Sequence, residues 1–128
     1  MGRPVTIPVV ADVAIGATAE NVLAGIPQRI PSEDSRIDVA LTRESVDVLY
    51  GLEIANQVAV PRGSPCQVNT TIGSLPRFDQ DNIGSFGVRA GEEIALFVSN
   101  SNAALQEFRA QIRITALSDL GLIPQNLA

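Results

Sequence analysis

The sequence predicts an all-β fold, an antiparallel β-sandwich of the jelly-roll type with eight or nine short strands. Apolar residues alternate with polar ones along several short segments, which is the period of a strand with one buried face. Gly, Pro, Asn and Asp gather between these segments, and no stretch has the 3.6-residue period of an amphipathic helix. Many short strands separated by such turns are typical of sandwiches, jelly rolls and barrels.

The length and composition fit a single domain. The chain has 128 residues, of which 45% are hydrophobic and only 18% are charged. A typical soluble domain has about 25% charged residues, so part of the apolar surface is expected either to lie in a compact core or to be covered by a partner. We predict one β-sandwich domain over residues 1–128, with residues 1–8 and 117–128 as candidate extended segments.

The first strand is predicted at residues 5–15, where apolar side chains occupy every second position. Pro8 lies within it and has no N–H to donate to a ladder, so this strand is expected at a sheet edge or at a bend. An edge strand presents unpaired backbone groups, and we therefore consider pairing of this edge with another subunit.

Residues 36–54 are predicted to form a hairpin of two alternating strands. Arg43, Glu44 and Ser45 would form its turn. Gly51 interrupts the second strand and is expected to mark a β-bulge.

The middle of the chain is predicted to contain two short strands, at residues 58–60 and 66–72, followed by a long loop at residues 73–87. Pro, Asp, Asn and Gly residues break any regular pattern in that loop. Loops of this length usually carry function or dock on a neighbour, so the loop is a candidate contact segment.

The last two strands are predicted at residues 94–98 and 108–116. The second has the cleanest alternation, and its polar face is expected to contact water or another subunit. That face carries Glu107, Arg109, Gln111 and Arg113. Residues 117–128 would form a short helix on their own domain or an arm that reaches a neighbour.

The residue inventory argues against most catalytic machinery. The chain has no His and one Cys, Cys66, which excludes Ser-His-Asp and Cys-His nucleophile pairs and an ordinary structural zinc site. Cys66 is expected to pack in the interior. No glycine-rich phosphate loop is present. We therefore predict no catalytic, cofactor-binding or metal-binding residues, no cofactor and no enzymatic activity.

Three acidic groups are the remaining candidates for chemistry: Glu33–Asp34, Asp79–Asn82 and Glu92–Glu93. Each lies in a predicted turn or loop, where solvated charge is the ordinary interpretation. The second group begins like a calcium loop but lacks the later Gly and Glu of an EF-hand. A glycosidase would need two such carboxyl groups to converge on a cleft.

The charge balance argues against nucleic acid as a partner. The net charge is −5, and all nine basic residues are Arg. Affinity for nucleic acid depends largely on the neutralisation of phosphates, which an acidic surface does not favour. The exclusive use of Arg reflects either genome composition or interfaces that tolerate desolvated guanidinium groups. No stretch reaches the ~20 apolar residues that cross a bilayer, and no apolar signal segment follows Met1, so we expect synthesis in a host cytoplasm.

The chain resembles the small jelly-roll proteins of bacterial virions, that is, minor capsid, cement and decoration subunits. The resemblance covers roughly residues 36–116. It rests on the alternating segments Arg36–Ile54, Val88–Asn100 and Phe108–Ala116. It lies in strand rhythm and composition, and no functional residue is carried over from it. The resemblance implies a virion component that associates with itself, for example as a trimer or around another symmetry axis, and with other capsid subunits.

Three hypotheses follow. A virion structural protein would form a symmetric homo-oligomer, with the loop at residues 73–87 or the terminal segments buried between chains. A ligand- or carbohydrate-binding β-sandwich, either lectin-like or cupin-like, would have a concave polar pocket, although the usual His-rich cupin metal site is impossible here. A carboxylate-dependent hydrolase would bring two acids together in a groove.

Overall fold

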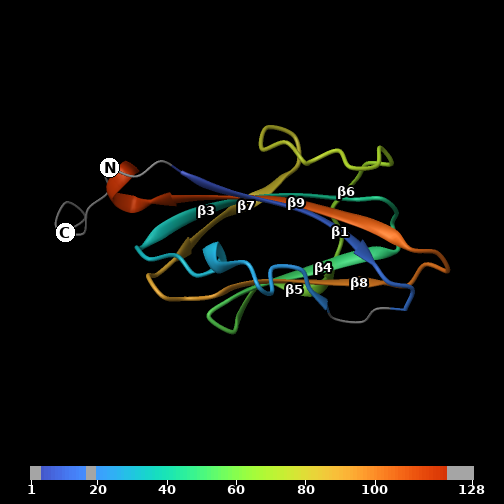
Figure 1. Ribbon diagram of the computed structural model, residues 1–128, viewed down its shortest axis with the longest axis horizontal. Coiled ribbons are helices and arrows are strands. Elements are labelled where there is room, and N and C mark those ends of the chain that lie inside the picture. The colour runs from blue at the N-terminus through green and yellow to red at the C-terminus, as the bar shows by residue number, and fades with distance from the viewer. Residues whose placement is uncertain (1–3, 17–19, 121–128) are drawn as a thin grey trace.

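The computed structural model describes residues 4–16 and 20–120, and these residues form nine strands in two packed sheets (Figure 1). Sheet A contains β1 (Val5–Val13), β9 (Gln106–Ala116), β3 (Ser35–Arg43), β7 (Asn82–Val88) and the two-residue β6 (Gln67–Val68). Sheet B contains β2 (Glu20–Asn21), β8 (Ile94–Asn100), β4 (Val48–Ile54) and β5 (Gln57–Ser64). Two short 3-10 helices, η1 (Pro27–Arg29) and η2 (Leu117–Leu120), complete the described part.

The strand order is that of a jelly roll. With β6 set aside, the other strands form four nested antiparallel pairs: β1 with β9, β2 with β8, β3 with β7, and β4 with β5. This is the pairing of one long hairpin that has been folded so that its successive pairs alternate between two sheets. The predicted sandwich is confirmed. The short β6 pairs with β3 in parallel, so sheet A is mixed rather than wholly antiparallel.

The core lies between the two sheets and is mainly aliphatic. The alternation that predicted strands also selects the inward side chains, because successive residues of a strand point to opposite faces. In β1, Ile7, Val9 and Val13 are buried, whereas Val10, which points to the other face, is 50% exposed. Phe108 and Tyr50 are the aromatic side chains fully or almost fully buried with them.

The predicted hairpin at residues 36–54 is wrong. Its two strands are β3 in sheet A and β4 in sheet B, and residues 44–47 cross from one sheet to the other. Alternation is the same whether two successive strands pair or cross, so the pattern could not separate these outcomes. The tight hairpin of sheet B is β4–β5, in which Ala55 and Asn56 both have positive φ (54° and 63°), as a two-residue turn requires.

The predicted loop at residues 73–87 is also wrong in its second half, because β7 begins at Asn82 and pairs with β3 along its length. Gly84, with φ +145°, lies where the register shifts opposite Val39, so the strand is bent and its alternation is masked. The predicted strand at residues 66–72 is reduced to β6. The long connection is therefore residues 69–81.

Both sheets have edges that resist pairing with another strand. β1 is an edge of sheet A, as its proline predicts, and Pro8 removes a donor near its centre. β5 is an edge of sheet B, contains Pro61 and has two register shifts against β4. Prolines and bulges are the usual protection of edge strands. These edges therefore disfavour the extension of either sheet by a second subunit.

The chain ends are only partly described. Residues 5–8 belong to β1 rather than to an arm, and η2 follows β9 directly, with Leu117 N donating to Asp34 O at 3.0 Å. Residues 1–3 and 121–128, which hold the rest of the predicted extensions, lie outside the described residues. No helix in the described part is long and apolar enough to cross a membrane.

Candidate functional site

The outer face of sheet A was the first candidate, because the polar row of β9 was expected to meet water or a partner. The structure corrects this expectation. Arg109 is 0% exposed and Glu107 is 6% exposed. Residues 69–81, yellow-green to yellow in Figure 1, pass over this side of sheet A. The chain therefore covers the part of its own polar face that carries Glu107 and Arg109, whereas the side chain of Arg113 remains 40% exposed.

A pair of charged side chains holds this covering segment in place. Arg109 Nε donates to Glu107 Oε1, and Arg109 Nη1 donates to Asn69 O at 2.6 Å. Gly73 N donates to the same Glu107 oxygen at 2.7 Å. The backbone N of Glu107 in turn donates to Glu44 Oε1 at 2.9 Å. The buried pair thus joins β9 to the start of the segment at residues 69–81 through two backbone groups.

The electrostatics of Glu107 follow from these contacts. Burial by itself raises the pKa of a carboxyl group, because it penalises the charged form. Here the hydrogen bonds from Gly73 and Arg109 and the charge of Arg109 outweigh burial, so the pKa of Glu107 lies below its ordinary value. Glu107 is therefore a charged structural group and not a poised general acid.

A second carboxylate on this face, Asp38 of β3, is paired in a similar way. Its side chain accepts hydrogen bonds from Ser85 Oγ and from Arg113, whose Nη2 lies at 3.2 Å, and Arg36 Nη2 lies at 3.5 Å. Burial again raises the pKa of Asp38, but these bonds and the two positive charges lower it overall. The Arg113 guanidinium also lies 4.5 Å from the ring centroid of Phe78, which fixes the end of the covering segment.

The three acidic groups predicted from the sequence serve local structure. Asp81 Oδ2 accepts from Arg77 N at 2.8 Å, and Asp79 pairs with Arg77 at 3.0 Å on the surface. Asp34 Oδ1 accepts from Ala90 N at 2.9 Å. Glu92 caps the same turn through Arg89 N, and Glu93 pairs with Arg29. Among the described residues, no group of three or more acidic or Cys side chains is placed to hold a metal ion.

Two of these acids do come together, at one end of the sandwich. Asp34 and Glu92 border an open hollow of about 460 Å³ with Arg36, Arg89 and Leu117. Residues 34 and 92 are far apart in sequence, and no sequence pattern connects them. Both carboxylates accept hydrogen bonds from backbone N–H groups of the turn after β7, so they support the rim of the hollow.

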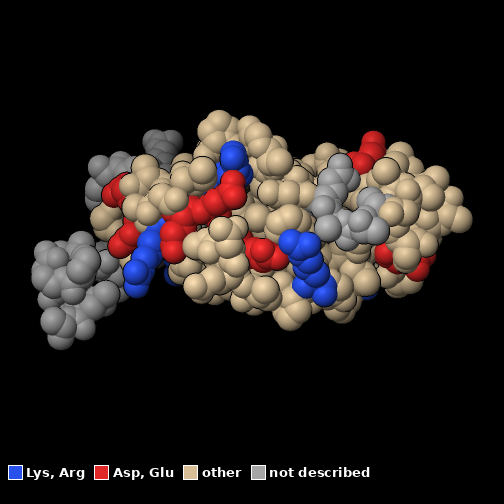
Figure 2. All heavy atoms as spheres, turned by 90° about the horizontal axis from the view of Figure 1, so that it is seen from below, with Lys and Arg blue, Asp and Glu red and all other residues tan. Residues whose placement is uncertain are grey.

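The outer face of sheet B is different in character. Its outward side chains are small or apolar apart from one ion pair, in which Arg62 Nε lies 3.1 Å from Glu53 Oε2. Figure 2 views the molecule from this side: most charged residues gather toward the left of the view, further acidic residues lie at its right end, and most of the surface between them is uncharged apart from red and blue spheres near the centre. The outward residues are Leu49, Gly51 and Glu53 of β4, Val58 and Arg62 of β5, and Ala95, Phe97 and Ser99 of β8.

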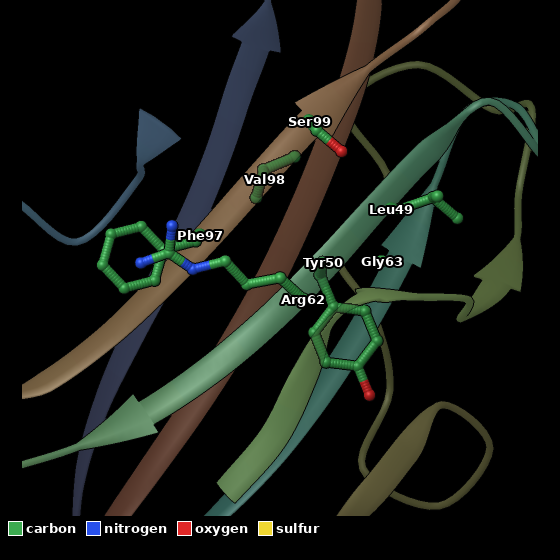
Figure 3. Close-up of a pocket in the computed structure, with 7 residues that line it drawn as sticks. All are labelled: Leu49, Tyr50, Arg62, Gly63, Phe97, Val98 and Ser99. Atoms are coloured by element: carbon green, nitrogen blue, oxygen red, sulfur yellow. The ribbon is translucent and has the colours of Figure 1, made fainter. Parts of the chain in front are cut away.

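Arg62 lies flat across this face, from β5 over β4 to β8 (Figure 3). Its guanidinium carbon is 3.9 Å from the centroid of Phe97. Gly51 lies beneath it, and a Cβ there would come within 2.6 Å of Arg62 Cγ and 2.7 Å of its Cα. The predicted bulge at Gly51 is confirmed, since the register against β5 shifts between Tyr50 and Leu52.

The hollow that the described residues form on this face is very small. The hollow beside Arg62, bordered by Leu49, Tyr50 and Phe97, has a volume of about 10 Å³. That is the space of one water molecule at most. This hollow is therefore too small to hold a ligand larger than a water molecule.

Cys66 lies between the two sheets at the sandwich margin, where it is half-buried and packs against the core, as predicted. Burial raises the pKa of its thiol to about 12. The thiol is therefore protonated at neutral pH, and it lacks the thiolate character that a nucleophile needs.

The fold and the two outer faces define a jelly roll with one self-covered polar face and one open, nearly uncharged face. Comparison of the chain with protein-family models, with curated proteins and with solved structures found no significant match.

Proposed function

We propose that the protein is a non-enzymatic structural subunit of a virion, a minor capsid, cement or decoration protein. It acts through contacts with copies of itself and with neighbouring capsid subunits. The jelly-roll strand order supports this proposal, because double-sheet jelly rolls are typical of viral capsid domains, lectins and cupins. A cupin metal site of the usual kind needs His, which the chain lacks.

The observation that carries the proposal is the open outer face of sheet B. The described outward residues of β4, β5 and β8 include one cation and one anion, the Arg62–Glu53 pair, on a chain with a net charge of −5. Contact surfaces are depleted in charge at their centre and enriched in Arg and aromatic residues, as at Arg62 and Phe97. A protein that works by contact needs such a face and needs no reactive centre.

Quantitative mass spectrometry of purified particles tests this function. Particles would be banded on a density gradient from a culture that carries this sequence. We expect the chain in the particle band at a fixed ratio to the major shell protein, after synthesis in the host cytoplasm. Recovery of the chain only in the soluble host fraction would contradict the proposal.

A ligand-binding module is the second candidate, and the hollow of about 460 Å³ beside Arg36 and Arg89 is the observation in its favour. Its volume falls in the range of small-molecule sites, about 300–1,000 Å³. Its lining includes no aromatic side chain to stack on a sugar, and Arg36 and Arg89, which lie there with Asp34 and Glu92, are the groups that could bind a small anion. A thermal-shift screen with small carboxylates and sulfated sugars would support this candidate by a saturable rise in Tm that Arg89→Ala abolishes.

A further inference from the structure

We propose that two copies of this chain associate face to face through the outer face of sheet B, about a two-fold axis. This inference rests on the proposed function for the contacts between copies of the chain, and the proposed contacts with other capsid subunits do not depend on it. It adds the surface, the symmetry and the residues at the centre of the contact, namely Arg62, Phe97 and Gly51.

The charges on this face favour contact between two copies. Each copy carries a net charge of −5, so two copies repel each other over most approaches. The outward residues of β4, β5 and β8 include one cation and one anion, Arg62 and Glu53, which lie side by side. A face with this pair is complementary to itself after a 180° rotation, because each Arg62 can then approach the Glu53 of the other copy.

The packing of Arg62 on this face also favours contact. Gly51 leaves room for Arg62 to lie against β4, and Phe97 holds its guanidinium at the surface of β8. The side chain is therefore already fixed in the unbound protein, and its association loses little rotamer freedom. Arg and aromatic residues are also the usual energetic centre of protein contacts. Ser99, next but one to Phe97 on β8, is small and half-buried, so it does not obstruct a close approach to this centre.

The outer face of sheet A and the edge strands β1 and β5 are less suitable for contact between copies. The polar face of sheet A is covered by residues 69–81, which Arg109 and Glu107 hold in place. The edge strands β1 and β5 contain Pro8 and Pro61, which oppose pairing of one sheet with another. A contact through the outward residues of β4, β5 and β8 requires neither of these two edges.

The test is sedimentation velocity over a wide concentration range, with two matched variants of the full chain. Val58→Glu places a carboxylate on the proposed contact, where Val58 is 64% exposed. Val10→Glu makes the same change on the edge strand of sheet A, where Val10 is 50% exposed. We expect the wild type and Val10→Glu to be concentration-dependent dimers. Val58→Glu should raise the dissociation constant by about tenfold or more, because like charges then face each other.

A charge reversal gives an independent readout. Arg62→Glu alone places two acids side by side on each face and should dissociate the dimer. The exchange Glu53→Arg with Arg62→Glu restores one cation and one anion and should recover most of the association. Circular dichroism and urea unfolding confirm that each variant is folded. A monomeric wild type at every concentration, or equal weakening by Val10→Glu and Val58→Glu, would overturn the inference.

The outcome is separable from that of the proposed function. If the chain forms the predicted dimer but is missing from purified particles, the virion proposal is contradicted and the proposed contact stands. If the chain is a strict monomer but is present in particles, the proposed contact is contradicted and the virion proposal stands on contacts with other capsid subunits.

Discussion

The two outer faces of this sandwich differ in their charged residues and in what covers them. The outer face of sheet A carries most of the charged side chains of its strands, including Asp38, Glu107, Arg109 and Arg113, and the chain folds its own residues 69–81 over them. The outer face of sheet B carries one ion pair, and none of the described residues forms a comparable cover there. The difference teaches that polar alternation along a strand does not identify the face that meets water. The same pattern here marks where the chain binds itself.

Two arginines show the contrast at the level of single residues. Arg109 on sheet A is 0% exposed and holds a loop through a backbone carbonyl and a carboxylate. Arg62 on sheet B has a side chain that is 51% exposed and lies across a glycine onto an aromatic ring. Arg109 links two parts of the chain, whereas Arg62 is exposed and ordered on the outer face of sheet B.

Removal of Arg109 should have the largest effect. Arg109→Met leaves Glu107 buried without its counter-ion, and breaking a buried pair in this way costs about 3–5 kcal/mol. Urea unfolding would measure the loss. The double variant Arg109→Met with Glu107→Leu should lose less than the single variant, because no uncompensated charge remains buried. A single variant within 0.5 kcal/mol (about the effect of an ordinary surface change) of the wild type would remove the structural role of this pair.

Gly51→Ala should cause the second largest loss of stability. Its Cβ would meet the side chain and backbone of Arg62, so β5 must shift, and such overpacking costs about 1–3 kcal/mol. Gly87→Ala in β7 is the matched control, because no atom lies within 4 Å of a Cβ there. Urea unfolding of both variants checks the difference. Equal stability of the two variants would show that Arg62 does not need the space above Gly51.

Acid should weaken sheet A. The pKa values of Glu107 and Asp38 lie below their ordinary values of 4.5 and 3.8 in the folded protein. A depressed carboxyl pKa stabilises the fold at pH values above the unfolded pKa, and that contribution is lost as pH falls through the folded pKa. We expect Tm to be level from pH 7 to about pH 5 and to fall below about pH 4. Glu107→Gln should fall less steeply, and an equal slope in the two proteins would count against the pairing of Glu107.

The smallest expected effect lies in the β4–β5 turn of sheet B. Ala55 and Asn56 both have positive φ, which Asn and Gly adopt more readily than Ala. The change Ala55→Asn with Asn56→Gly should therefore raise the free energy of unfolding by about 1 kcal/mol. Thermal unfolding would measure this, and a fall in Tm would show that the turn is of another type.

The sequence predicted the fold class because local alternation determines strands, and it placed β1 at an edge through Pro8. It failed where the outcome depended on distant residues. Nothing local separates a hairpin from a crossing at residues 44–47, and Gly84 masks the alternation of β7. The burial of Arg109 depends on Asn69, forty residues away. On the outer face of sheet B, Gly51 was the residue whose role could be predicted locally, since a glycine inside a strand often marks a bulge or the close approach of another group.

Hydroxyl-radical footprinting at low and high protein concentration tests the contrast between the faces most directly. The account predicts that labelling of Phe97, Leu49 and Val58 falls as concentration rises, while labelling of Ile72, which is 64% exposed beside sheet A, stays constant. Protection of Ile72 without protection of Phe97 and Val58 would place the contact on the other face and contradict the account.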